Sequence, residues 1–181
     1  RVNNLKLFNL EKNIKTYYGD IADKKLFYKF LNKAKPNILF HLAAQPLVKE
    51  SYKNPHKTFE TNVMGTLNVL EYAKTSKDLK STVLITSDKC YKNKELSSGY
   101  TENSEIGGDD PYSASKAAAE NLFYAYNKSF FKKNNIGAAT VRAGNVIGGG
   151  DWCKDRIIPD AIRSIIKKKK LIVRSPDAVR P

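Results

Sequence analysis

A tyrosine and a lysine one helical turn apart, Tyr112 and Lys116 in the segment PYSASK, form a pattern with a clear chemical use. Side chains at positions i and i+4 share one face of a helix. A nearby ammonium stabilises a phenolate, so the tyrosine could act as a base toward a sugar or alcohol hydroxyl near neutral pH. The three small residues between them leave room for a cofactor. Taken alone, the pattern also fits an ordinary exposed tyrosine beside a solvated lysine.

A second cluster, TSDKCY, places a hydroxyl, an acid and an amine in succession at Ser87, Asp88 and Lys89. It follows Thr82–Ile85, a β-branched and apolar run that is typical of a buried strand. A solvated surface loop is the simple alternative, with Lys89 as one of its exposed lysines. The position of the cluster at a predicted strand end favours a role in a binding crevice.

The elements that position these residues alternate between strand and helix. The periodicity predicts strands over residues 14–19, 38–42 (buried on both faces), 81–85 and 137–143, helices over 23–33, 56–74, 112–132 and 156–168, and an extended stretch over 171–173. Asp110-Pro111 is a start signal for the third helix. Strands separated by helices indicate an α/β fold with a doubly wound parallel sheet.

Three polar loops follow predicted strands and should converge, because such sheets bind ligands outside the carboxyl ends of their strands. They are HLAAQP, TSDKCY and AGNVIGGGDW. The glycines of GGGDW do not form the GxGxxG phosphate loop, and we interpret that segment as a turn leading to a substrate lobe.

Composition narrows the classes of function. The chain has 181 residues and a net charge of +14, but the lysines are scattered apart from the run at 167–170, so charge alone is a weak argument for nucleic-acid binding and we expect none. The two cysteines, Cys90 and Cys153, and the two histidines, His41 and His56, lack metal-ligand spacing, so no metal is expected. Without a long apolar run or a leader, we expect no membrane association and a reducing, cytoplasmic location.

The order of motifs resembles the extended short-chain dehydrogenase/reductase family, in its nucleotide-sugar branch. The segments that carry the resemblance are GDIAD, FHLAAQ, ETNVMGTLNVLE, TSDKCY, DPYSASKAAAE and RAGNVIGGGDW, which cover nearly all of the chain. HLAAQPLV, TSDKCY, DPYSASK and RAGNVIGGGDW together resemble most the CDP-glucose 4,6-dehydratases, whereas dTDP-glucose dehydratases usually have Thr-Asp-Glu in place of Ser87-Asp88-Lys89. The resemblance implies a lyase of deoxysugar and lipopolysaccharide O-antigen biosynthesis that uses NAD.

The resemblance also implies a role for each residue of the two clusters. Tyr112 would take the proton of the C4 hydroxyl, Lys116 would assist it and hold the nicotinamide ribose, and Ser87 would bind the C4 oxygen. Asp88 would protonate the departing C6 hydroxyl. Lys89 would either remove the C5 proton, if it is neutral, or stabilise the enolate, if it is protonated, and the sequence leaves both open.

For NAD, the resemblance implies a wider set of contacts. The residues expected to bind the cofactor are Asp20, Ile21, Leu42, Ala43, Ala44, Gln45, Thr61, Thr86, Tyr112, Lys116, Ala143 and Asn145. Asn62 is expected to bind backbone groups at the crevice. The residues expected to bind the nucleotide-sugar substrate are Ser87, Asn145, Arg156 and Arg180.

None of the ten glycines forms the GxxGxxG loop that the resemblance implies. We therefore expect the chain to be an internal piece of a longer protein and to be inactive alone. We expect residues 1–145 to form part of an NAD-binding Rossmann domain and residues 146–181 to begin a substrate-binding lobe. The two long helices are expected to pair into a homodimer. The alternative functions are those of another enzyme of the same branch that acts on a different nucleotide sugar (an epimerase, a dehydratase or a decarboxylase) and of a non-catalytic NAD-binding scaffold.

Overall fold

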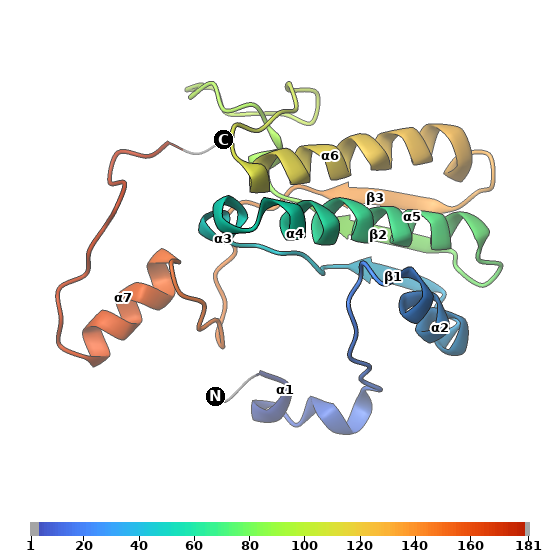
Figure 1. Cartoon of the computed structure of the whole chain (residues 1–181), viewed down its shortest axis with the longest axis horizontal. Helices are drawn as coiled ribbons and strands as arrows, with labels where there is room; N and C mark the ends of the chain where they lie inside the picture. The colour runs from blue at the N-terminus through green and yellow to red at the C-terminus, as the bar shows by residue number, and fades with distance from the viewer. Residues whose placement is uncertain (1–3, 180–181) are drawn as a thin grey trace. The chain divides into compact units, whose positions relative to one another are not determined.

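The computed structural model describes residues 4–179, which form two compact units (Figure 1). The larger unit comprises residues 19–144. The smaller unit comprises residues 145–179 together with the described residues up to Tyr18.

A parallel sheet of three strands is the centre of the larger unit. The strands are β1 (Ile38–His41), β2 (Ser81–Ile85) and β3 (Gly137–Val141), and they lie in the order β1-β2-β3. Ile38 is in register with Ser81, and Ser81 with Gly137, so the strands begin at one edge of the sheet and end at the other. The α/β architecture predicted from the alternating pattern is thus confirmed.

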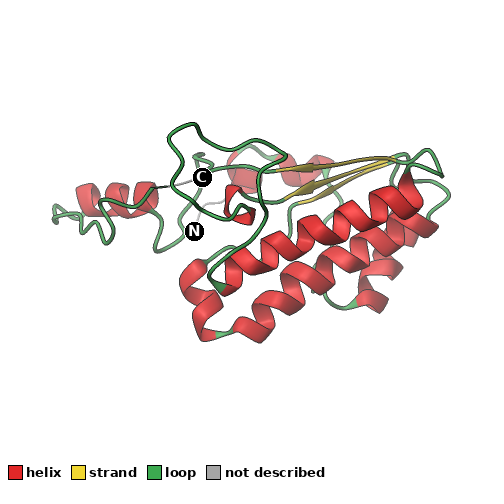
Figure 2. Ribbon diagram, turned by 90° about the horizontal axis from the view of Figure 1, so that it is seen from above, coloured by secondary structure: helices red, strands yellow, loops and turns green. Residues whose placement is uncertain are grey.

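The helices of the larger unit lie on one side of the sheet (Figure 2). They are α2 (Lys24–Ala34), α3 (Val48–Lys53), α4 (Pro55–Phe59), α5 (Gly65–Thr75) and α6 (Pro111–Tyr126), with a 3₁₀ turn η3 (Asp88–Cys90) after β2 and π-helical turns η2 (Glu60–Met64) and η4 (Asn127–Phe131). Helices α4 and α5 are joined through η2 into the helix predicted over 56–74. The helix predicted over 112–132 corresponds to α6 continued by η4.

The core lies between the sheet and these helices. Leu39 and Leu84 project from β1 and β2 and pack in one cluster with Leu70 of α5, Phe123 of α6 and Phe131 of η4. Burial of a side chain of this size stabilises the folded state by roughly 1.5–3 kcal/mol. This face of the sheet therefore fixes α5 and α6 against the central strand.

The opposite face of the sheet is open in β1, which corrects one prediction. Ile38 is 57% exposed and Phe40 is 64% exposed, whereas the run ILFHL predicted a strand buried on both faces. Alternate residues of a strand point to opposite faces, and within residues 4–179 helices cover only the face of Leu39 and His41. Apolar content alone does not reveal which face has a covering element.

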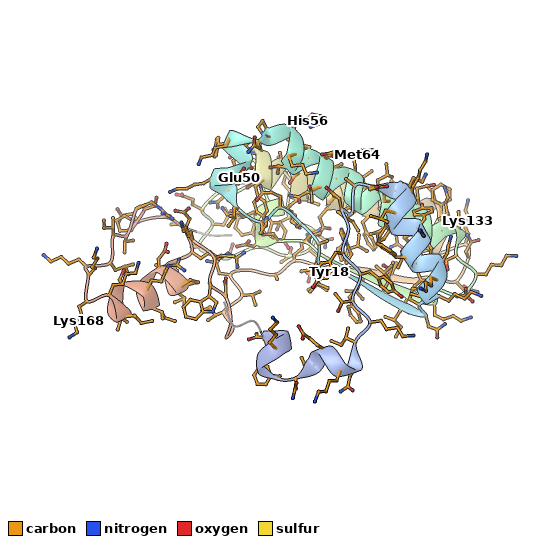
Figure 3. The ribbon with its side chains drawn as sticks, turned by 60° about the horizontal axis from the view of Figure 1, so that its bottom comes forward. Tyr18, Glu50, His56, Met64, Lys133 and Lys168 are labelled. Atoms are coloured by element: carbon orange, nitrogen blue, oxygen red, sulfur yellow. The ribbon has the colours of Figure 1, made fainter. Side chains whose placement is uncertain are left out.

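The strand predicted over residues 14–19 is also wrong. These residues have no regular secondary structure, and Tyr18, labelled in Figure 3, is 89% exposed. A strand requires a hydrogen-bonded neighbour. Within the described range, no strand pairs with the outer edge of β1.

The smaller unit contains α1 (Asn4–Leu7), the 3₁₀ turn η1 (Leu10–Asn13) and α7 (Ile157–Ile166), the last corresponding to the helix predicted over 156–168. The side-chain amide of Asn4 donates to the carbonyl of Gly149 at 2.6 Å. Arg163 of α7 donates to the carbonyl oxygens of Trp152 and Cys153 at 2.9 and 2.8 Å, which anchors the loop before the helix. The stretch predicted to be extended over 171–173 forms no strand.

Between residues 4 and 179, the helices are all too short or too polar to cross a lipid bilayer.

Gly108 determines how closely the loop before α6 approaches the helix. A Cβ atom at this position would lie 2.4 Å from the carbonyl carbon of Ser113. We expect Gly108→Ala to force the first turn of α6 away from the loop and to destabilise the protein by about 1–3 kcal/mol. Thermal unfolding measures the loss. The matched control is Gly107→Ala, where an added Cβ would meet Lys92 at an ordinary contact distance of 3.4 Å. Equal melting temperatures for the two variants would contradict the proposed close approach.

Candidate active site

The first turn of α6 is fixed by an acid and a hydroxyl. The Asp110 carboxylate accepts hydrogen bonds from the backbone N–H groups of Tyr112 and Ser113, both at 3.0 Å, as the Asp-Pro signal predicted. The N–H of Tyr112 also donates to Oγ of Ser51 in α3 at 3.2 Å. These contacts set where the Tyr112 side chain leaves the helix, and that side chain is 8% exposed.

Lys116 lies one turn further along α6 and is 7% exposed. Its Nζ donates to the carbonyl oxygen of Ile85, the last residue of β2, at 3.4 Å. Burial lowers the pKa of Lys116 from its ordinary value, and negative charge at Cys90 and Glu120 opposes that shift. A buried ammonium with one long hydrogen bond has donors available for a ligand rich in oxygen.

The segment Thr86–Lys89 continues the line of β2 toward η3. The N–H groups of Thr86 and Asp88 donate to the carbonyl oxygens of Val141 and Ala143, both at 2.9 Å, so the pairing with β3 extends beyond the strand end. Oγ of Ser87 donates to the carboxylate of Asp88 at 2.9 Å and accepts from the N–H of Lys89 at 3.2 Å. Ser87 and Asp88 are each 8% exposed, which differs from a solvated loop.

The five residues predicted to be catalytic lie on α6 and in or next to η3. These two elements pack against each other. Four of them are buried and Lys89 is half-buried. The structure therefore brings Ser87, Asp88 and Lys89 to the part of the larger unit where α6 carries Tyr112 and Lys116. Ala143, predicted to bind the cofactor, joins them through its carbonyl group.

Residues Leu42–Gln45 follow β1 at the same edge of the sheet. Leu42 and Ala43 are exposed and Ala44 is half-buried. The Asn62 amide accepts from the N–H of Gln45 at 2.7 Å and donates to its carbonyl at 3.1 Å. Asn62 also donates to Oγ of Ser115 at 2.9 Å, so its predicted contact with backbone groups is present and it ties this loop to α6. Its place in the π-helical turn η2 lets one side chain reach both neighbours.

Asp20 and Ile21 lie in the turn before α2. Asp20 accepts from the N–H of Ala22 at 2.9 Å and from Nζ of Lys57 at 2.7 Å, and the hydrogen bond from Lys57 is the main cause of its lowered pKa. Asn68 of α5 donates to the carbonyl of Ile21 at 3.0 Å. A Cβ on Gly65 would lie 2.6 Å from Ile21, so this turn packs closely on α5.

The remaining predicted residues are placed differently. Thr61 lies half-buried in η2 of the larger unit. Asn145 and Arg156 belong to the smaller unit, where Arg156 pairs with Asp151 at 3.0 Å. Arg180 lies outside the described residues.

Two charged residues near the site were not predicted. Glu120 is 3% exposed on α6, and its carboxylate receives the guanidinium of Arg142 at 3.0 Å and the hydroxyl of Thr140 at 3.1 Å. Glu120 follows Lys116 by four residues, so its position on the same helix face could have been found from the spacing. Arg142 follows β3, and no spacing or motif in the sequence indicated that it lies near the site.

His41 was predicted only as a residue that binds no metal. It is 6% exposed at the end of β1, and its Nε2 lies 3.1 Å from Oγ1 of Thr66. The Thr66 hydroxyl donates to the carbonyl of Asn62 at 2.6 Å, so it accepts from His41 and the proton lies on Nε2. Burial, and then the charge of Lys116, lower the pKa of His41 to about 4, which keeps it neutral at pH 7. Across the described residues, no group of three or more potential metal ligands is present.

The sequence of this chain is similar to those of known nucleotide-sugar dehydratases. The family model described as GDP-mannose 4,6 dehydratase matches residues 1–180. CDP-glucose 4,6-dehydratase of Salmonella typhimurium is 48% identical over 97% of this chain and 50% of its own length. dTDP-D-glucose 4,6-dehydratase of Dictyostelium discoideum is 34% identical over 95% of this chain and 41% of its own length.

Solved structures agree with the observed fold. UDP-glucose 4-epimerase of Thermotoga maritima, crystallised with UDP-glucose, superposes with a TM-score of 0.83 at 21% identity over 97% of this chain and 56% of its own. dTDP-glucose 4,6-dehydratase of Streptomyces venezuelae, crystallised with NAD, superposes with a TM-score of 0.72 at 27% identity over 84% and 45%.

The chain spans about half the length of the curated relatives that it matches. The family model covers every residue of the chain except the last. The chain belongs to the nucleotide-sugar dehydratase and epimerase branch of the extended short-chain dehydrogenase/reductase family.

Proposed function

We propose that the protein to which this chain belongs is an NAD-dependent 4,6-dehydratase that converts CDP-glucose to CDP-4-keto-6-deoxyglucose and water. The observation that carries the proposal is the triplet Ser87-Asp88-Lys89, buried or half-buried beside Tyr112 and Lys116, in a chain 48% identical to a CDP-glucose 4,6-dehydratase. A dehydratase needs an acid and a group that acts at C5, in addition to the tyrosine base. Asp88 and Lys89 have the chemistry for these tasks.

In the proposed reaction, Tyr112 removes the proton of the C4 hydroxyl as C4 is oxidised to a ketone. The ketone makes the C5 proton acidic, and its loss is coupled to departure of the C6 hydroxyl, which Asp88 protonates so that it leaves as water. Lys89 acts at C5, either as a neutral base or as an ammonium beside the enolate. Return of a hydride to C6 and a proton to C5 completes the change, with the net loss of one water.

Ser87 must change its hydrogen bond for this role. Its hydroxyl proton is donated to Asp88 at 2.9 Å, whereas binding of the C4 oxygen requires donation to the sugar. An exchange of this kind would also leave one Asp88 oxygen open to the C6 hydroxyl. Substrate binding and preparation of the acid would therefore be linked through a single hydroxyl.

Residues of the larger unit fit part of an NAD molecule. Lys116 has ammonium donors beyond its bond to Ile85, which suits the hydroxyls of a ribose. Leu42 and Ala43 are exposed after β1, and a Cβ on Gly144 would have no atom within 4 Å, so the backbone at these strand ends is accessible. Bound NAD would supply reversible hydride transfer. The chain contains no GxxGxxG loop, and we assign none of its residues to the cofactor diphosphate.

Substrate specificity is tested with the full-length protein, supplied with NAD and offered CDP-glucose or dTDP-glucose separately. We expect loss of one water from CDP-glucose, measured by mass spectrometry, and little or none from dTDP-glucose. Loss of water from dTDP-glucose alone would overturn the choice of nucleotide. Loss from neither, with NAD still bound, would favour an epimerase or a non-catalytic NAD-binding protein.

Tyr112→Phe tests the proposed base. The variant keeps the ring that packs at the start of α6 and loses the hydroxyl, so kcat should fall roughly 10²–10⁴-fold while NAD affinity changes little. Stopped assays with CDP-glucose, together with NAD titration, measure the two effects. Tyr52→Phe is the matched control, because Tyr52 is 65% exposed on α3. Full activity of the Tyr112 variant would exclude its role as base.

The outer sides of the long helices support a proposal of homodimerisation. Phe59 (39% exposed), Met64 (49%) and Tyr124 (65%) present apolar side chains on α4, η2 and α6, and Figure 3 shows Met64 on the outside of its helix. We expect the full-length protein to be a dimer by light scattering and Met64→Glu to shift it toward a monomer. Lys133→Glu, on an exposed residue after η4, is the charge-change control. A dimer unchanged by Met64→Glu would place the interface elsewhere.

A further inference from the structure

Glu120 links three elements around the candidate site. One carboxylate oxygen accepts the hydroxyl of Thr86, the residue before Ser87. The other accepts the hydroxyl of Thr140 in β3 at 3.1 Å and the guanidinium of Arg142 at 3.0 Å. One buried carboxylate on α6 therefore holds the ends of both β2 and β3.

Arg142 extends the same network to the loop that follows η3. Its guanidinium lies 4.9 Å from the centre of the Tyr91 ring and donates to the carbonyl of Glu102 at 3.0 Å. Burial opposes its charge, but hydrogen bonds to Glu120 and Tyr91 outweigh burial, so the pKa of Arg142 is raised. With side-chain exposures of 15% for Arg142 and 3% for Glu120, the two form a partly buried ion pair. A pair of this kind is weak evidence for a role in stability alone, because desolvation offsets much of its attraction.

The position of the pair suggests a different role. Glu120 follows Lys116 by one helical turn and Tyr112 by two, so the three side chains share the helix face that packs on the strand ends. We propose that Glu120, held by Arg142, is a positioning residue for the proposed reaction: it fixes Thr86, and with it Ser87–Lys89, against α6, and it places a negative charge one turn from the Lys116 ammonium. The inference rests on the proposed function for its kinetic consequence, but its effect on Lys116 is independent of any substrate.

Among the charged and titratable groups around Lys116, Glu120 is the one whose negative charge favours the Lys116 ammonium near neutral pH. These groups are Tyr112 and Glu120 on α6, Asp88, Lys89 and Cys90 in η3, His41 at the end of β1, and Arg142 after β3. The negative charges that oppose the effect of burial on Lys116 are those of Cys90 and Glu120. Burial raises the pKa of the Cys90 thiol to about 12, so Cys90 is neutral at pH 7. His41 is neutral there as well, which leaves Glu120 as the charge that favours the ammonium.

Removal of the Glu120 charge should change the pH dependence of kcat/KM in one direction. The Lys116 ammonium favours the Tyr112 phenolate, so loss of its proton weakens the base. Without the charge of Glu120, Lys116 should lose that proton at lower pH. The alkaline limb of kcat/KM should then move to lower pH.

Two variants at position 120 distinguish the effect of the carboxylate charge from the effect of the side-chain length. Glu120→Gln keeps the size but removes the charge and replaces one of the two acceptor oxygens with a donor NH₂ group, whereas Glu120→Asp keeps the charge and both acceptor oxygens and shortens the side chain. In the full-length protein labelled with ¹³C-lysine, the Cε signal of Lys116, assigned with Lys116→Arg, reports its titration. We expect the midpoint to move to lower pH in E120Q and to stay near the parent value in E120D. With CDP-glucose, E120Q should lower kcat roughly tenfold and shift the alkaline limb with it.

The control is Glu71→Gln, which removes a carboxylate on α5 that binds Lys74 and Tyr126. It should leave the Lys116 titration unchanged. An unchanged Lys116 midpoint in E120Q would overturn the proposal, as would equal midpoints in E120Q and E120D. If E120Q does not fold, the double variant E120Q/R142M leaves no unpaired charge and should shift the midpoint in the same direction, by less than E120Q because the positive charge of Arg142 is lost as well. If the parent protein dehydrates no nucleotide sugar, the proposed function fails while the Lys116 titration still decides the role of Glu120.

Discussion

The parallel pairing of β2 with both of its neighbours is the constraint on which the rest of the larger unit depends. Because β1, β2 and β3 run in the same direction and in register, their carboxyl ends meet at one edge. Each crossover must then return along the same face, which places α5 and α6 side by side on the sheet (Figure 1). The segments that follow β1 and β2 therefore start at the same edge of the sheet as the end of β3.

Near the carboxyl ends of the strands, the elements are held together by hydrogen bonds of polar side chains, whereas apolar contacts hold the core. Asn62 joins the loop after β1 to α6, Asp110 fixes the start of α6, and Glu120 holds the ends of β2 and β3. Asn62 and Glu120 are buried and have hydrogen-bond partners on neighbouring elements, as buried polar groups require. Directional contacts of this kind set orientation more narrowly than apolar contacts do, which suits a region that must hold a base, an acid and an amine in fixed relation.

The sequence allowed the fold class and the central elements to be predicted, because strong periodicity and a clear Asp-Pro start signal mark β2 and α6. The predictions over residues 14–19 and on both faces of β1 were wrong, since apolar and aromatic content does not tell whether a strand has a neighbour or a sheet face has a cover. For the site, Tyr112, Lys116 and Ser87–Lys89 could be found from spacing and from their place after a strand. Arg142 could not, because its importance depends on Glu120, Tyr91 and Glu102, which lie far from it in sequence.

The exposed apolar face of β1 affects the tendency of the chain to associate in water. Ile38, Phe40 and Leu42 are each more than half exposed in consecutive alternate positions, next to a strand edge whose backbone groups have no strand partner within residues 4–179. Apolar side chains and an unpaired edge on the same strand form a template to which another extended chain can add. The strand that leads to Leu42–Gln45 is thus also a part of the larger unit that is prone to aggregation while its edge and open face stay uncovered.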